Sequence, residues 1–120
     1  MTFDETKTGN ERSGTLNWMS PEQYLTPNLV TRKSDVWSFG MTVWEVLCND
    51  IPYKDYGPYE IPEAIVSDDE RPRKPKELSP HLEPLWTLIT MCWQVDPADR
   101  PFAADIVKYL KKHYGSELRL

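Results

Sequence analysis

The sequence feature that most constrains the fold is the stretch from residue 33 to 48, "KSDVWSFGMTVWEVLC". Its apolar side chains recur at helical spacing on two faces. One face carries Val36, Phe39, Val43 and Leu47, and the other carries Trp37, Met41, Trp44 and Cys48. A narrow polar stripe remains, formed by Ser38, Thr42, Glu45 and Asn49. We therefore predict a central helix that is buried almost all round, with its start capped by the side chain of Ser34 or Asp35.

Further helices are predicted on both sides of a long Pro-rich connection. A short helix is expected in "EIPEAIV", and a longer one from Pro84 in "PLWTLITMCW". That second helix has a broad apolar face formed by Leu85, Leu88, Ile89, Cys92 and Trp93. The last helix is predicted from Phe102 to about His113, with Gly115 as its stop and with Phe102, Ile106, Tyr109 and Leu110 packed. No alternating strand pattern of useful length occurs, so the fold class is predicted to be all-α.

Segments without a helical period complete the predicted organisation. Residues 1–13 are polar and expected to be mobile, residues 14–114 form the domain, and residues 115–120 form a tail. The stretch "TLNWMSPEQYL" is predicted to be an ordered loop. In the connection "SDDERPRKPKELSP", acidic residues precede Arg71, Arg73, Lys74 and Lys76, and this mixture of charges indicates a solvated loop.

Composition excludes several classes of function. The 120 residues carry a formal net charge of -5, which argues against a nucleic-acid or anionic-membrane binder. No stretch has the length of a membrane span, and we expect a cytoplasmic protein. Cys48 and Cys92 lie in apolar helical patterns and are interpreted as reduced core thiols. His81 and His113 have no nucleophile or ligand partner at motif spacing, so neither a hydrolase nor a metal site is expected.

Five motifs in order resemble the C-terminal helical lobe of eukaryotic protein kinases. They are "GTLNWMSPE", "SDVWSFGMTVWEVL", "IPY", "RP" at 71–72 and "CWQVDPADRP". The resemblance runs from about Ser13 to Leu110. Trp18-Met19 before Ser-Pro-Glu is most similar to tyrosine-kinase-like and tyrosine kinases. Gly14-Thr15 resembles the pair that opens the substrate-docking loop of serine/threonine kinases. The combination favours the tyrosine-kinase-like branch.

The resemblance implies roles for individual residues. Gly14, Thr15 and Trp18 would belong to the substrate-docking loop, with Thr15 lining the groove for the acceptor residue. Asp35 would accept hydrogen bonds from backbone amides of the catalytic loop. Glu22 would pair with Arg100 and tie the end of the activation segment to the last helices, although Ser20 replaces the Ala of the family's Ala-Pro-Glu. The candidate phosphorylation sites are Thr6, Thr8, Ser13 and Thr15.

The motifs that bind the nucleotide and catalyse phosphoryl transfer are missing from this sequence. It has no Gly-rich loop, no accompanying Lys, no His-Arg-Asp and no Asp-Phe-Gly, so no catalytic, cofactor-binding or metal-binding residue is assigned. The complete family domain would use ATP and Mg²⁺. By the resemblance, Met1 falls inside the activation loop, and the fold is the incomplete C-terminal lobe.

Two hypotheses of different classes follow. The chain is a piece of a kinase that phosphorylates protein Ser, Thr or Tyr and is inactive by itself, or it is a non-catalytic module that binds a partner protein. Coding DNA upstream of Met1 distinguishes them: in-frame Asp-Phe-Gly and His-Arg-Asp would favour the first hypothesis.

Overall fold

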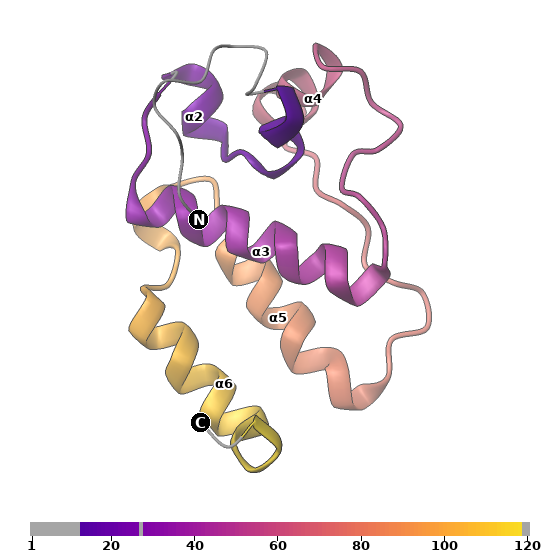
Figure 1. Ribbon diagram of the computed structural model, residues 1–120, viewed down its shortest axis with the longest axis vertical. Helices are drawn as coiled ribbons and strands as arrows, with labels where there is room; N and C mark the ends of the chain where they lie inside the picture. The colour runs from indigo at the N-terminus through magenta and orange to yellow at the C-terminus, as the bar shows by residue number, and fades with distance from the viewer. Residues whose placement is uncertain (1–12, 27, 119–120) are drawn as a thin grey trace.

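Helix α3 (Arg32–Cys48) crosses the middle of the molecule, and other elements lie on both sides of it (Figure 1). The structure is a computed structural model that describes residues 13–26 and 28–118. The described residues contain only helices and connecting loops, which confirms the predicted all-α fold class. None of the helices between residues 13 and 118 combines the length and apolarity that crossing a membrane requires.

Two short elements precede α3. The 3₁₀ helix η1 (Ser13–Trp18) is followed by α2 (Pro21–Leu25), so the segment predicted to be an ordered loop is helical in two places. Pro21 opens α2 as a first-turn residue, where its missing N–H costs no hydrogen bond. Thr6 and Thr8 lie outside the described residues, and so do the side chains of Ser13 and Thr15.

The cap of α3 differs from the prediction. Thr31 is the N-cap residue, and its side-chain oxygen accepts a hydrogen bond from the Ser34 backbone N–H at 3.1 Å. Ser34 and Asp35 are therefore inside the first turn, where the Asp35 carboxylate still faces the positive end of the helix dipole. The helix ends at Cys48, and its C-cap residue, Asn49, adopts a left-handed conformation with φ of 49°.

After α3, the chain forms α4 (Glu60–Pro62), which continues directly into the π-helix η2 (Glu63–Ser67). This confirms the short helix predicted in "EIPEAIV". The 3₁₀ helix η3 (Pro80–Leu82) leads into α5 (Glu83–Cys92), in which Pro84 takes the expected first-turn position. The 3₁₀ helix η4 (Pro97–Asp99) then connects α5 to α6 (Ala103–Leu118).

Close packing of α5 against α3 builds the core. A Cβ atom on Gly40 would lie 2.8 Å from the Cys92 Cβ and 3.0 Å from the Trp93 Nε1, so only glycine lets the two helices approach this closely. The cluster of buried side chains around this contact comprises Val36, Trp37, Met41, Trp44, Tyr53, Ile61, Ile65, Leu88, Ile89, Cys92, Trp93 and Ile106.

The prediction that α3 is buried almost all round is wrong. Its buried face follows Trp37, Met41 and Trp44, but Phe39 is 37% exposed and Val46 is 77% exposed. The reason is that α5, η1 and the loops after α3 cover only part of its circumference (Figure 1). We call Phe39 and Val46 the open apolar face of α3.

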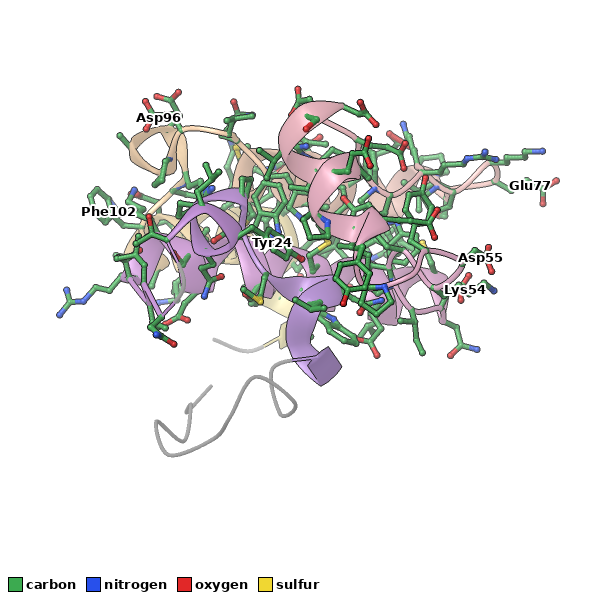
Figure 2. The ribbon with its side chains drawn as sticks, turned by 90° about the horizontal axis from the view of Figure 1, so that it is seen from above. Tyr24, Lys54, Asp55, Glu77, Asp96 and Phe102 are labelled. Carbon is green, nitrogen blue, oxygen red and sulfur yellow. The ribbon has the colours of Figure 1, made fainter. Side chains whose placement is uncertain are left out.

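Helix α6 also departs from the prediction, because it runs through Gly115 to Leu118. The buried Tyr114 donates its hydroxyl to the His81 carbonyl at 2.8 Å, and Glu117 pairs with His81 at 3.0 Å. These contacts on both sides of Gly115 outweigh the roughly 1 kcal/mol that a glycine costs inside a helix. The prediction that the last helix stops at Gly115 is therefore wrong. Phe102, predicted to pack, is 62% exposed and projects at the edge of the molecule (Figure 2).

Candidate functional site

The candidate site begins at the first turn of α2, where the sequence Ser-Pro-Glu places a carboxylate near α3. The buried Gln23 fixes this turn, since its Oε1 accepts from the Ser20 backbone N–H at 3.0 Å and from the Ser20 hydroxyl at 2.9 Å. Glu22 follows Pro21 and points away from solvent, with 17% of its side chain exposed. The turn therefore places the Glu22 carboxylate in the interior in a fixed orientation.

Arg100 meets this carboxylate from the linker between η4 and α6. Its Nη1 donates to Glu22 Oε2 at 2.7 Å, and its Nη2 donates to Glu22 Oε1 at 2.8 Å. The remaining N–H groups donate to three backbone carbonyls, those of Lys33, Gln94 and Val95. A residue that is only 2% exposed thus has an acceptor for each of its five N–H groups, as a buried guanidinium requires.

The Glu22 carboxylate is held in its charged form. Burial by itself would raise its pKa, but hydrogen bonds from Arg100, Ser34 and the Glu22 backbone N–H lower the pKa to about 2. The Ser34 hydroxyl donates to Glu22 Oε2 at 2.8 Å. We refer to Glu22, Ser34 and Arg100 as the latch. It joins α2, α3 and the linker before α6.

A second arginine, Arg71, also packs on Trp37, which is fully buried in the core. The guanidinium carbons of Arg71 and Arg100 lie 4.7 Å and 5.1 Å from the Trp37 ring centroid. Arg71 also donates from Nε and Nη2 to the Trp93 carbonyl, at 3.2 Å and 3.0 Å. The interpretation of 71–76 as a solvated loop is therefore wrong for Arg71, although Arg73, Lys74 and Lys76 are exposed.

Only one of the two arginines was predicted from the sequence to belong to this arrangement. Glu22 and Arg100 were expected to pair, and the structure brings them together. Arg71 and Ser34 were missed as members of this arrangement. The available signal for Arg71 was the Arg-Pro dipeptide, which occurs at 71–72 and again at 100–101.

Trp18 attaches η1 to α3. Its indole N–H donates to Glu45 Oε1 at 3.1 Å, and its carbonyl accepts from the Ser38 hydroxyl at 2.8 Å. The Asn17 side chain donates to the Pro52 carbonyl at 2.7 Å, which adds a second tie. Of the residues assigned to a substrate-docking loop, Trp18 is thus anchored to the core, while Gly14 and Thr15 lie in η1.

Asp35 lies apart from the latch. It is exposed on the first turn of α3. Its side chain makes no hydrogen bond or ion pair within residues 13–26 and 28–118.

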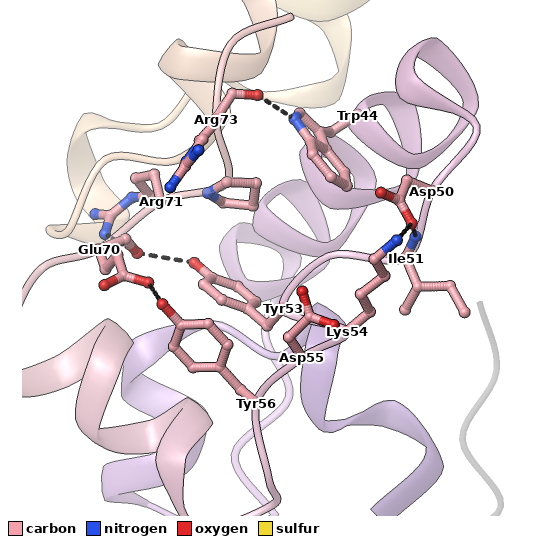
Figure 3. Close-up of a pocket in the computed structure, with 11 residues that line it drawn as sticks. Trp44, Asp50, Ile51, Tyr53, Lys54, Asp55, Tyr56, Glu70, Arg71 and Arg73 are labelled. Carbon is pink, nitrogen blue, oxygen red and sulfur yellow. Dashed lines mark hydrogen bonds and ion pairs between the residues drawn. The ribbon is translucent and has the colours of Figure 1, made fainter.

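A polar hollow of about 630 Å³ opens where the loop after α3 faces residues 70–73 (Figure 3). Most of its polar groups are already paired. The Tyr53 and Tyr56 hydroxyls donate to the backbone and side chain of Glu70, Lys54 pairs with Asp50, and the Trp44 indole donates to the Arg73 carbonyl.

The thiols do not form a reactive site. Both cysteines are free, and burial raises the pKa of Cys92 to about 12 and also raises that of Cys48. In the described part of the chain, no three His, Cys, Asp or Glu side chains gather closely enough to hold a metal ion.

Comparison with known proteins assigns the family. Residues 1–110 match the model of the protein tyrosine and serine/threonine kinase family. The chain belongs to the protein kinase family. Its helical, strand-free described part agrees with the helical lobe of the kinase fold, as the motifs implied.

Individual kinases match over most of this chain. It is 35% identical to the mitogen-activated protein kinase kinase kinase zak-1 of Caenorhabditis elegans over 104 residues, which are 87% of this chain and 14% of that protein. It is 35% identical over 100 residues to the serine/threonine-protein kinase STY17 of Arabidopsis thaliana, covering 83% of this chain and 17% of that kinase. Identity to the Arabidopsis serine/threonine/tyrosine-protein kinase HT1 is 36% over 100 residues, covering 83% of this chain and 25% of HT1. The chain thus spans a quarter or less of these relatives.

Proposed function

We propose that this chain forms the helical, substrate-facing part of a protein kinase domain that transfers the γ-phosphoryl group of ATP to Ser or Thr of a protein substrate, with Tyr as the alternative acceptor. The observation that carries the proposal is the latch. It fastens the segment bearing Gly14, Thr15 and Trp18 to the linker before α6 through a buried bidentate ion pair. Phosphoryl transfer depends on positioning, and a substrate loop held by α3 and this pair serves that purpose.

In this proposal the residues support chemistry that other parts of a kinase domain perform. Glu22 and Arg100 hold the substrate loop. The exposed Asp35 carboxylate is available to accept N–H groups from the catalytic loop of a complete domain, which would also bind ATP and Mg²⁺. The partner is a protein substrate rather than nucleic acid or a membrane, and the expected compartment is the cytoplasm.

The 120-residue chain by itself should neither bind Mg-ATP nor transfer phosphate, because it lacks every motif that contacts the nucleotide. Thermal unfolding with and without Mg-ATP tests this expectation. A ligand that binds only the folded state must raise the melting temperature by mass action. A clear rise would contradict the assignment of the nucleotide chemistry to other segments.

A chimera tests the kinase function itself. The part of the zak-1 kinase domain that precedes its matching segment is joined to this chain, and ATP-dependent phosphorylation of a generic protein substrate is measured. We expect activity that Glu22→Gln reduces at least tenfold, while Glu77→Gln, on the exposed loop, leaves it unchanged (Figure 2). A folded chimera without activity would contradict the proposal.

The alternative is a non-catalytic module that binds a partner protein, and the open apolar face of α3 favours it. Phe39 and Val46 leave apolar side chains in water, as protein-binding surfaces do. Folded but inactive chimeras, together with coding DNA that has no in-frame kinase motifs upstream of Met1, would support this alternative.

A further inference from the structure

One tyrosine differs from the other five in this chain. Tyr59 is 92% exposed, at the N-terminus of α4. The other five tyrosine hydroxyls all donate hydrogen bonds. The acceptors are the Leu16 carbonyl for Tyr24, the Glu70 carbonyl for Tyr53, the Glu70 carboxylate for Tyr56, the Pro84 carbonyl for Tyr109 and the His81 carbonyl for Tyr114. In the described part of the chain, the Tyr59 hydroxyl has no such partner.

The surroundings of Tyr59 are acidic. Asp55 lies four residues before it, Glu60 follows it directly, and Glu63 lies four residues after it; all three are exposed. The Glu60 carboxylate accepts the Gly57 backbone N–H at 2.7 Å, which holds this acidic group on the turn that presents Tyr59. An enzyme that recognises this segment must therefore bring cationic side chains to it.

We infer that Tyr59 is a site of phosphorylation by a protein tyrosine kinase that selects acidic sequences. The Tyr59 oxygen attacks the γ-phosphorus of Mg-ATP bound to that enzyme, and the bond between the γ-phosphorus and the β–γ bridging oxygen breaks. ADP leaves, and the phenolic proton passes to a base of the modifying enzyme. This inference is independent of the proposed function, because it makes the chain a substrate.

Modification at Tyr59 is compatible with the folded state. Because its ring lies almost entirely in solvent, a phosphate there displaces no core contact. It adds a charge of about −1.5 to −2 at pH 7 to a surface that already carries carboxylates. Modification of Tyr53 or Tyr114, which are buried, would require their hydrogen bonds to open first.

The test compares the folded chain with a peptide of the same sequence. The 120-residue chain and a synthetic peptide of residues 54–66 are each incubated with Mg-ATP and a purified acidic-directed tyrosine kinase, and the sites are mapped by mass spectrometry. The peptide contains Tyr56 and Tyr59 without the Glu70 that binds the Tyr56 hydroxyl. We expect both tyrosines to be modified in the peptide, and Tyr59 at least tenfold more than any other tyrosine in the chain.

Matched variants complete the design. Tyr59→Phe should reduce phosphate incorporation into the chain at least tenfold, and Tyr56→Phe on the same loop should leave it unchanged. The exposed position of Tyr59 makes the Phe variant safe for folding, which circular dichroism verifies. An unmodified Tyr59 in either the chain or the peptide would overturn the inference. Comparable modification of another tyrosine in the chain would do so as well.

Discussion

Breaking the latch should destabilise the chain more than any other single polar substitution. In Glu22→Gln the bidentate ion pair is lost while the shape of the side chain is kept, and Arg100 keeps its charge with no exposed side-chain surface. Removing one partner of a buried pair costs about 3 to 5 kcal/mol, whereas an exposed pair contributes about 0 to 1 kcal/mol. Since whole domains are stable by about 5 to 15 kcal/mol, such a loss approaches the total for a small chain. We expect Glu22→Gln and Arg100→Ala to unfold at much lower urea concentration or to lose cooperative unfolding.

The controls separate burial from charge. Glu83 also pairs with a cation, Lys74, at 2.8 Å, but both side chains are nearly half exposed. Glu83→Gln makes the same chemical change in an exposed pair and should shift stability by less than 1 kcal/mol. Glu77→Gln and Lys112→Ala, both at exposed positions, should also have little effect. Arg100→Lys keeps the charge but cannot reach all five acceptors, so an intermediate loss is expected.

The latch also predicts how stability depends on pH. Because the folded state lowers the pKa of Glu22 from 4.5 to about 2, the stabilisation is fully present above about pH 4.5 and is lost as the pH falls towards 2. The difference in unfolding free energy between the parent and Glu22→Gln should therefore shrink over that range. A loss of 1 kcal/mol in unfolding free energy lowers the melting temperature of a domain of this size by about 4 °C or more. Melting temperatures of parent and variant that agree within about 2 °C at neutral pH would therefore refute the reasoning.

Three further pairs of substitutions test the core and the surface. Gly40→Ala should destabilise by about 1 to 3 kcal/mol in urea unfolding, because its Cβ meets Cys92; Gly115→Ala, with its nearest neighbour at 3.9 Å, should stabilise by about 0.5 to 1 kcal/mol. An equal effect of the two would contradict the close packing of α3 on α5. Arg71→Ala should lower the free energy of unfolding by about 2 kcal/mol, because the contact with Trp37 is lost. Arg73→Ala should change it by no more than about 0.5 kcal/mol. Equal losses in the two variants would place Arg71 in solvent. The parent chain should bind an apolar dye and self-associate through the open apolar face of α3, and Phe39→Ser with Val46→Ser should reduce both. A dye-negative, monodisperse parent would exclude that surface.

Helical periodicity predicted where the helices lie, but not which of their apolar side chains other segments cover. The residues from 33 to 48 have the apolar spacing of a helix whatever packs against them, so the extent of α3 was predictable. Whether Phe39 and Val46 are covered depends on which other segments reach them, and periodicity carries no such information. The true end of α6 at Leu118 was not predicted for a similar reason, since Gly115 ends the helix only where tertiary contacts around it do not hold the helix together. Tyr114 and Glu117 supply those contacts through His81.

The same limit explains why one arginine of the site was predictable and the other was not. Arg100 and Arg71 each precede a proline, a position that disfavours the helical region and favours extended backbone. Extended backbone lets each side chain reach across to the end of α5, where Arg71 donates to the Trp93 carbonyl and Arg100 to those of Gln94 and Val95. Of these carbonyls only that of Trp93, the C-cap residue, belongs to the end of α5, so the Arg71 guanidinium lies at the negative end of the helix dipole. Gln94 and Val95 follow the helix, and Arg100 satisfies the carbonyls of that turn. Both guanidiniums also lie over the Trp37 ring, so each gains a cation–π contact with the same core residue. From the sequence, Arg100 had a recognisable carboxylate partner, but Arg71 binds mainly carbonyls and an indole, which charge patterns do not reveal. The acidic neighbours that suggested a solvated loop include Asp69, whose carboxylate does pair with Arg71 Nη1 at 2.9 Å. The same guanidinium nevertheless donates to the Trp93 carbonyl and lies over the Trp37 ring, and both tryptophans belong to the core.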